Sequence, residues 1–430
     1  MVNLFSLVFG KVISAFSRMF NLGNGSTWPG QIALTLNQDF ISQILKRNKL
    51  KIILIAGTNG KTTTGKLIQT ILEKDNELVF QNSAGANLLN GIASSLIANS
   101  DFNGKIAKDF AIFEIDENTL PHILKEIKNP DFVIILNIFR DQLDRYGEVN
   151  TIASKWKNAL KNLDQKTTLI LNADDPLVTF LGEKIKAKIL YFGINPDKNK
   201  NDKAQHASDS TYCPSCKTKL IYDSVYFSHL GNWNCVKCGY SHPKKTLTSF
   251  PFYPLLGTYN QYNTNAAVLL AKDLGLTDEK IKNALKDFKP AFGRQETLTL
   301  KDKNVQIFLS KNPTGLNESL KTVASEKAQN ILLLLNDRIP DGLDVSWIWD
   351  VDFEDFTDKF KNITAGGDRI FDMGLRLKYA EYKNFALEEN LSKAIEIALD
   401  KTNKGETLYV LPTYSAMLEV RKILTGKKIL

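Results

Sequence analysis

The residues most suited to chemistry lie in the stretch GTNGKTTT, residues 57–64. It follows an apolar run and opens a helix-like segment, so a glycine turn would present backbone N–H groups and a helix N-terminus to an anion. Lys61 would reach the terminal phosphates of a nucleotide, and the Thr62 hydroxyl would hold Mg²⁺. The interval from Gly57 to Gly60 is tighter than in the common G-x-x-x-x-G-K-[ST] loop. The alternative is a glycine turn with a surface lysine, but the context favours nucleotide binding.

A second candidate is the carboxylate of Glu114, which ends the apolar run in FEID beside Asp116 and Glu117. A carboxylate at the carboxyl edge of a parallel strand, near such a loop, is suitably placed to bind Mg²⁺. The alternative is a solvated strand end. We expect Glu114, rather than its neighbours, to be the ligand.

All four cysteines of the chain lie in one short block, CPSC followed after eighteen residues by CVKC. This spacing is typical of a tetrahedral Zn²⁺ site with no open position, which is structural rather than catalytic. The expected ligands are Cys213, Cys216, Cys235 and Cys238. The alternative is four unligated thiols. We expect a scaffolding role, and no nucleic acid as partner, because the block lacks a basic stripe.

If the cysteines hold zinc, none remains as a nucleophile, and none of the four histidines lies in a nucleophile–base motif. Release of ammonia from glutamine by thioester chemistry is therefore not expected of this chain. Ammonia, if it is the amine used, would come from solution or from a partner.

The elements that must position these residues follow from the hydropathy pattern. The 430 residues allow two or three domains. Apolar runs alternate with helix-like stretches, which predicts an α/β fold with a parallel sheet. The expected strands are 51–57, 77–83, 109–116, 131–138 and 167–174, and a second strand–helix set follows residue 300. The polar stretch from about 195 indicates a loop or insertion.

The N-terminal stretch LFSLVFGKVISAFSRMF (4–20) is mostly apolar, with only Lys11 and Arg18 charged, and its pattern is amphipathic. We interpret this segment as a helix packed on the protein. The alternative is an interfacial helix near a membrane.

Five motifs then occur in the order seen in one family: GTNGKTTT, NIFRDQLDRYG (137–147), LNADDP (171–176), GTYNQYNTNAA (257–267) and GRQE (293–296). The chain resembles the Mur ligase superfamily. The resemblance implies a central P-loop ATPase domain, here with an inserted Cys₄ zinc ribbon, followed by a Rossmann-like C-terminal domain. It implies that ATP phosphorylates a carboxylate and that an amine attacks the acyl phosphate.

The resemblance also implies site residues and boundaries. Lys61 and Glu114 would be catalytic, with Thr62 and Glu114 binding Mg²⁺. Nucleotide binding is expected of Gly57, Thr58, Asn59, Gly60, Lys61, Thr62, Thr63, Asn260, Asn263 and Arg294. The expected divisions are an N-terminal helical segment at 1–48, the ATPase domain at 49–292 with the ribbon at about 205–245, and the C-terminal domain at 293–430.

Some positions depart from the family pattern. Gln142 and Tyr259 replace histidines of the family motifs, and LSKNP (309–313) replaces a longer motif. Lys155 lies near the place of the family's carbamylated lysine, with a plain surface lysine as the alternative.

The ribbon, the short segment before the loop and the stretch NDRIPDGLDVSWIWDVDFE (336–354) resemble the branch that forms one subunit of a lipid II-amidating synthase. That resemblance implies amidation of the D-glutamate α-carboxyl of lipid II, with ammonia from a class I glutaminase (GatD-like) in a heterodimer. Asp344 would orient the histidine of that partner, or would cap the following helix. The location expected is the cytoplasm, with the inner face of the membrane as a further option. The alternative function is a stand-alone ligase of the folylpolyglutamate synthase type.

Overall fold

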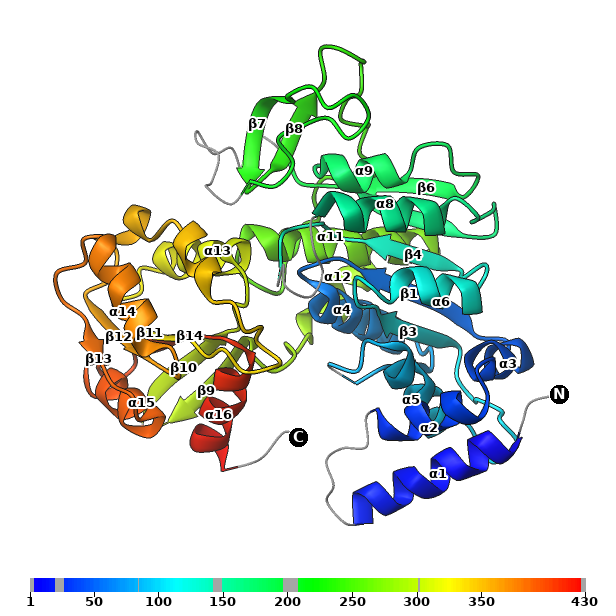
Figure 1. Ribbon diagram of the computed structural model, residues 1–430, viewed down its shortest axis with the longest axis horizontal. Helices are drawn as coiled ribbons and strands as arrows, with labels where there is room; N and C mark the ends of the chain where they lie inside the picture. Colours follow the sequence, from blue (N-terminus) through cyan, green and yellow to red (C-terminus); the bar gives the residue numbers. More distant parts are fainter. Residues whose placement is uncertain are drawn as a thin grey trace.

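The computed structural model describes residues 4–19, 27–83, 85–141, 149–195, 208–300 and 302–426. Two α/β units lie side by side, each built on a six-stranded sheet (Figure 1). The strands of the first sheet are β1 (Lys51–Ala56), β2 (Val79–Gln81), β3 (Phe110–Glu114), β4 (Phe132–Ile135), β5 (Thr168–Asn172) and β6 (Lys188–Phe192). All their pairings are parallel, in the order β2-β3-β1-β4-β5-β6. The predicted parallel α/β fold is confirmed.

Helices cover both faces of this sheet, which is why its central strands are apolar almost throughout. One core includes side chains of α5 (Leu89–Asn99), α6 (Leu120–Glu126), α8 (Val149–Leu160) and α9 (Pro176–Leu181). The other includes side chains of α4 (Lys61–Lys74), α11 (Thr258–Asp273) and α12 (Asp278–Lys286). The hydropathy pattern missed β6 because this edge strand is only partly buried.

Three helices precede the sheet: α1 (Leu4–Met19), α2 (Trp28–Leu36) and α3 (Phe40–Arg47). They contribute Leu7, Ala33 and Phe40 to the core that contains α5. None of the helices in the described part of the chain has the length and hydropathy that a membrane span requires.

The cysteine block forms a small lobe around an antiparallel hairpin of β7 (Ile221–Phe227) and β8 (Leu230–Asn234). Figure 1 shows this lobe beyond β6 and α9. Most of the predicted polar insertion, residues 196–207, lies outside the described residues.

The second sheet has the order β13-β12-β11-β14-β10-β9, and only β9 runs antiparallel to its neighbour. Its strands are β9 (Arg294–Leu300), β10 (Lys303–Phe308), β11 (Asn330–Leu334), β12 (Asn362–Gly366), β13 (Ala386–Leu387) and β14 (Thr407–Pro412). Its helices are α13 (Pro313–Ser325), η1 (Ser346–Asp350), η2 (Phe353–Phe356), α14 (Ile370–Tyr379), α15 (Leu391–Asp400) and α16 (Tyr414–Thr425). The division of the chain into domains at residues 48 and 292 stays a prediction.

Candidate active site between the two units

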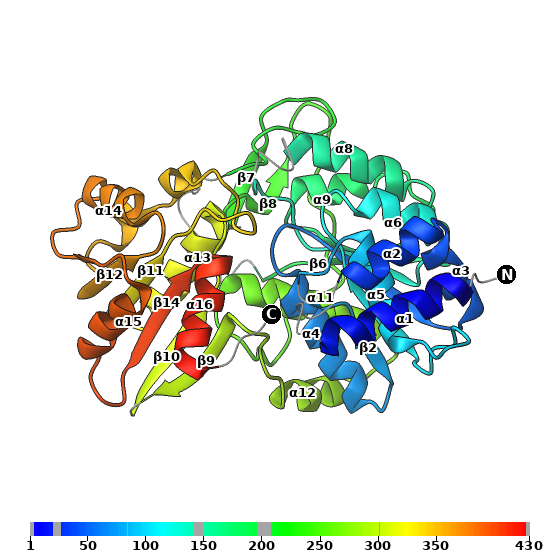
Figure 2. The same ribbon diagram turned by 60° about the horizontal axis from the view of Figure 1, so that its bottom comes forward.

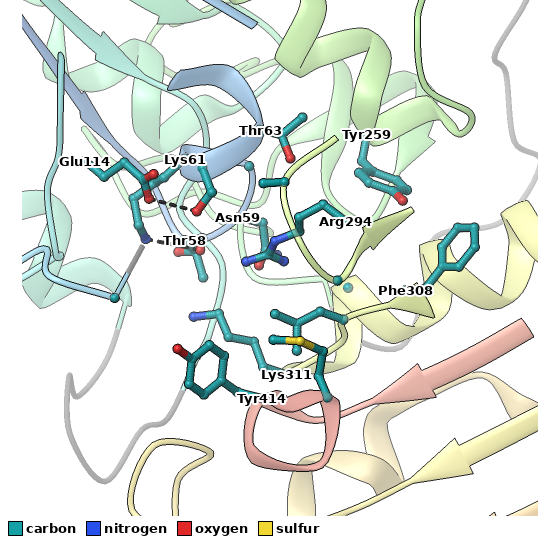
Figure 3. Close-up of a pocket in the computed structure, with 18 of the residues that line it drawn as sticks. Thr58, Asn59, Lys61, Thr63, Glu114, Tyr259, Arg294, Phe308, Lys311 and Tyr414 are labelled. Atoms are coloured by element: carbon teal, nitrogen blue, oxygen red, sulfur yellow. Dashed lines mark hydrogen bonds between the residues drawn. The ribbon is translucent and has the colours of Figure 1, made fainter. Parts of the chain in front are cut away.

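A pocket of about 750 Å³ lies between the two units (Figure 3). The first unit contributes the turn after β1, the end of β3 and the start of α11. The second unit contributes the starts of β9 and α13 and part of α16. The lining includes the predicted residues Thr58, Asn59, Gly60, Lys61, Thr62, Thr63, Glu114, Asn260, Asn263 and Arg294. Residues from positions 58 to 294 of the sequence therefore meet at one site.

The turn between β1 and α4 has the geometry of an anion-binding loop. Gly57 and Gly60 adopt φ angles of 142° and 92°, which favour glycine. A Cβ at Gly60 would lie 2.1 Å from Oδ1 of Asn263, so this position also needs glycine for space. Asn137 holds the turn, because its carbonyl accepts from the Thr58 N–H and its Oδ1 accepts from the Asn59 N–H at 2.9 Å. The N-terminus of α4 therefore faces the pocket.

Thr62 and Glu114 meet beside this turn, where the Thr62 hydroxyl donates to Glu114 Oε2 at 2.8 Å. Glu114 is buried, and its Oε1 has no hydrogen-bond partner among the described residues. Burial raises the pKa of Glu114, although Thr62, Lys61 and Arg294 oppose the shift. A buried carboxylate oxygen without a partner, next to a hydroxyl, fits the oxygen ligands that Mg²⁺ prefers. The Lys61 ammonium bonds to the Gly57 carbonyl and, at 3.2 Å, to Glu117.

The second unit brings two cations to the same pocket. Arg294 is partly buried at the start of β9; desolvation lowers its pKa, and the charge of Glu114 partly offsets that effect. Lys311, in the stretch LSKNP, contacts Asp141 of the first unit. Burial lowers the pKa of Lys311, but the carboxylates of Asp141 and Glu117 outweigh that effect and raise it overall. Figure 3 shows both side chains pointing toward the loop. Lys311 was not predicted as a site residue, because the sequence shows only that it lies in LSKNP.

A reciprocal amide pair also joins the units at the loop. Asn59 and Asn312 exchange hydrogen bonds of 3.3 and 3.0 Å, and Asn312 caps α13 through the Gly315 N–H. On the opposite wall, Asn263 donates to Asn260 at 3.1 Å. Because the phosphate loop touches the second unit directly, its position depends on how the two units meet.

The four cysteine sulfurs lie within 4.8 Å of one another, and two pairs are 3.6 and 3.4 Å apart. Four ligands at about 2.3 Å from a tetrahedral zinc would place their sulfurs roughly 3.8 Å apart. The donor set and spacing therefore fit a metal ion. The hairpin of this lobe places Phe227 in the lining of the pocket.

Asp174 of LNADDP joins the cysteine lobe to the first unit. Its buried carboxylate accepts from His242, Lys245 and Tyr262 at 2.7, 2.7 and 2.8 Å. Asp175 caps α9 and also accepts from the Ile138 N–H. Asp174 thus acts in positioning the lobe, a role that the motif alone does not reveal.

Two other predicted positions, Asp344 and Lys155, lie outside the lining of the pocket. Asp344 is exposed outside the pocket lining and accepts from the N–H of Ser346, the first residue of η1, at 2.8 Å. That bond lowers the pKa of Asp344. Lys155 is exposed on α8, which agrees with a plain surface lysine. Gln142 lies outside the described residues.

Comparison with known proteins extends this picture. Residues 55–271 match the family model of the Mur ligase middle domain, and residues 309–417 match that of the MurT ligase C-terminal region. The lipid II isoglutaminyl synthase (glutamine-hydrolyzing) subunit MurT of Streptococcus pneumoniae (strain ATCC BAA-255 / R6) is 34% identical, over 95% of this chain and 94% of that protein. The chain belongs to the MurT branch of the Mur ligase family. The same-named subunit of Staphylococcus aureus (strain COL) is 34% identical over 91% of each chain.

Solved structures show the same fold for this Mur ligase at lower identity. A pseudomurein peptide ligase type C from Methanothermus fervidus superposes with a TM-score of 0.64 at 22% identity, covering 88% of this chain and 79% of that one. The predicted Mur ligase fold is confirmed.

Proposed function

We propose that this chain is the ligase subunit of a lipid II isoglutaminyl synthase. It would convert the α-carboxyl of D-glutamate in the lipid II stem peptide to the amide of D-isoglutamine, with ATP as the energy source. The observation that carries the proposal is the pocket itself, in which the phosphate loop, the Thr62–Glu114 pair and the Arg294 and Lys311 cations converge. The near-full-length similarity to two subunits of that name supports the choice of substrate.

The pocket suits a two-step amidation. An oxygen of the substrate carboxylate attacks the γ-phosphorus of ATP, the bond to ADP breaks, and an acyl phosphate forms. Ammonia then attacks the acyl carbon, the C–N bond forms, and inorganic phosphate leaves. Phosphoryl transfer depends mainly on positioning and charge neutralisation. Lys61, Arg294 and Lys311 would supply that neutralisation from three sides.

The two proposed metal ions, Mg²⁺ and Zn²⁺, would have different roles. Thr62 and Glu114 would hold Mg²⁺, which when bound neutralises phosphate charge. The four cysteines would hold a structural Zn²⁺ that keeps the lobe, and with it Phe227, at the pocket. The domain boundaries at residues 48 and 292 belong to the same proposal.

A class I, GatD-like glutaminase is the proposed source of ammonia, bound as a heterodimer. Two features support it: the relatives are named as subunits of a glutamine-hydrolyzing enzyme, and the four cysteines are engaged in one cluster. The proposed docking surface lies beside Asp344. It consists of Trp349 of η1 and of Phe371, Leu375 and Tyr379 on α14, all exposed, with Trp349 and Tyr379 in ring contact at 5.4 Å. The complex would act in the cytoplasm, at the inner face of the membrane where lipid II is presented.

The test compares nitrogen donors. Purified chain with Mg-ATP and lipid II should amidate with ammonium salt alone, but with glutamine only after the glutaminase is added. The Lys61→Ala variant should be inactive with both donors. Glutamine-driven turnover by the chain alone would contradict the partner, and turnover with glutamate as the amine would favour the folylpolyglutamate synthase type of ligase. No observation in the structure favours that alternative.

A further inference from the structure

The N-terminal helix α1 has two different faces. Ser6, Leu7 and Gly10 are buried against the protein, where Leu7 joins the core that contains α5. The opposite face exposes Phe5, Val8, Phe9, Val12 and Phe16. At 100° per residue these five positions fall within an arc of about 100°. Packing on the protein therefore accounts for one side of this helix and leaves an apolar stripe on the other.

The stripe is strongly exposed for a set of large apolar side chains. Phe5, Phe9 and Val12 are 65%, 44% and 57% exposed, and the rings of Phe5 and Phe9 stack at 5.9 Å. The exposed ring of Phe102 also lies near α1, because its centroid is 5.5 Å from the Lys11 ammonium. Contiguous exposed apolar patches of this kind mark interaction sites.

The N-terminal sequence that carries the stripe is basic. Residues 1–51 contain a single acidic residue, Asp39. They contain six basic residues, namely Lys11, Arg18, Lys46, Arg47, Lys49 and Lys51. Arg47 lies close to α1, because both Arg47 and Leu7 border Gly104. An apolar helical face in a basic segment of the chain matches the interface of a bilayer that contains anionic lipid.

The helix is also connected to the pocket. Lys11 donates to the carbonyls of Ile97 and Ser100 at the end of α5, while Leu88 at the start of α5 lines the pocket. Trp28, 69% exposed, begins α2, whose Gly30 contacts the first turn of α5. Figure 2 shows α1 and α16 on the same face of the molecule. The helix α5 therefore runs from its contact with α1 to the lining of the pocket.

From this we infer that α1 lies flat on an anionic bilayer and holds the pocket near the membrane. The sixteen residues of α1 make a helix of about 24 Å, which is suited to lie in the interface. The inference rests on the proposed function only for its purpose, the capture of a lipid-linked substrate. The surface that carries it is separate from the pocket.

The test is a vesicle sedimentation assay with the full-length chain, without ATP or lipid II, so its result does not depend on the proposed reaction. Vesicles of phosphatidylcholine alone are compared with vesicles containing phosphatidylglycerol. We expect binding to the anionic vesicles, and a roughly tenfold or greater loss of partitioning in the double variant Phe9→Asp, Val12→Asp. The variant Phe9→Leu, Val12→Leu should retain binding. Ile221→Asp, which changes an apolar side chain of similar exposure (47%) on β7, is the matched control and should bind normally.

Two outcomes would overturn the inference: no binding of the wild-type chain to anionic vesicles, or binding of the double aspartate variant as strong as that of the wild type. Sedimentation velocity gives a further check, because a wild-type dimer that the same double substitution dissociates would assign the stripe to a second copy of the chain. Circular dichroism and the thermal midpoint would show that the aspartate variants are folded.

Discussion

The hydroxyl of Thr62 donates a 2.8 Å hydrogen bond to Oε2 of Glu114, and thereby joins the first turn of α4 to the carboxyl end of β3. The other oxygen of Glu114 is buried without a partner among the described residues. We expect Thr62→Val to reduce Mg-ATP turnover roughly 100-fold or more. The substitution removes the Thr62 hydroxyl oxygen as a Mg²⁺ ligand and leaves Oε2 of Glu114 without its hydrogen-bond donor. Thr62→Ser keeps the hydroxyl and should keep most activity. Initial rates over a Mg²⁺ titration measure the effect, and an unchanged Mg²⁺ requirement in Thr62→Val would contradict it.

The buried carboxylate of Glu114 should be required for turnover and yet lower the stability of the metal-free protein. Burial raises its pKa, so the folded, metal-free protein releases this proton at a higher pH than the unfolded chain does. Below the unfolded pKa both states are protonated and there is no penalty; as pH rises through the folded pKa, the penalty reaches its full value. Glu114→Gln should therefore stabilise the metal-free protein by roughly 1–2 kcal/mol at neutral pH while abolishing turnover. The gain in thermal midpoint should shrink toward pH 4, and a constant gain across pH would contradict this cause.

Much of this site was predictable from sequence because its chemistry lies in local motifs. The glycine turn, Glu114 at a strand end and the paired CxxC motifs all carry their signals within a few residues. The motifs LSKNP and LNADDP do not reveal the roles of Lys311 and Asp174, because these depend on partners far along the chain: Asp141 for the former, and His242 with Tyr262 for the latter. For the fold, the long apolar runs of the first sheet were clear, whereas the half-exposed β6 and the buried but short β12, with the sequence NITAG, were missed.

Arg294 approaches the phosphate loop from the second unit. The loss of kcat in Arg294 variants should therefore show how much catalysis depends on the contact between the two units. Arg294 is partly buried, lines the pocket and interacts electrostatically with Glu114, which lines the same pocket. Arg294→Ala should lower kcat roughly 10³-fold, as expected when a cation that stabilises a transferring phosphoryl group is removed. Arg294→Lys should recover only part of the loss, because lysine lacks the planar fork. Arg338→Ala, which removes an exposed arginine of the same unit, is the control and should be near wild type in ammonium-driven turnover.

Removal of the metal from the cysteine cluster should affect the pocket indirectly. We expect one zinc per chain by elemental analysis, and its loss in Cys216→Ser. Because the lobe carries Phe227 into the pocket, the variant should raise the KM for ATP more than it lowers kcat. Ser215→Ala, between the two cysteines, is the control. A zinc-free variant with an unchanged thermal midpoint and KM would contradict the structural role of the metal.

Substitution of Asp344 should distinguish the glutaminase activity of the proposed enzyme from its ligase activity. Its carboxylate is exposed beside the proposed docking surface, and the Ser346 N–H holds it ionised by lowering its pKa. If it orients the histidine of the glutaminase, Asp344→Asn should reduce glutamine-driven amidation by about 10²-fold or more. The same variant should retain ammonium-driven amidation, because Asp344 lies outside the lining of the ligase pocket. Asp355→Asn, an exposed carboxylate on η2, is the matched control. Equal loss of both activities would instead assign Asp344 to the capping of η1.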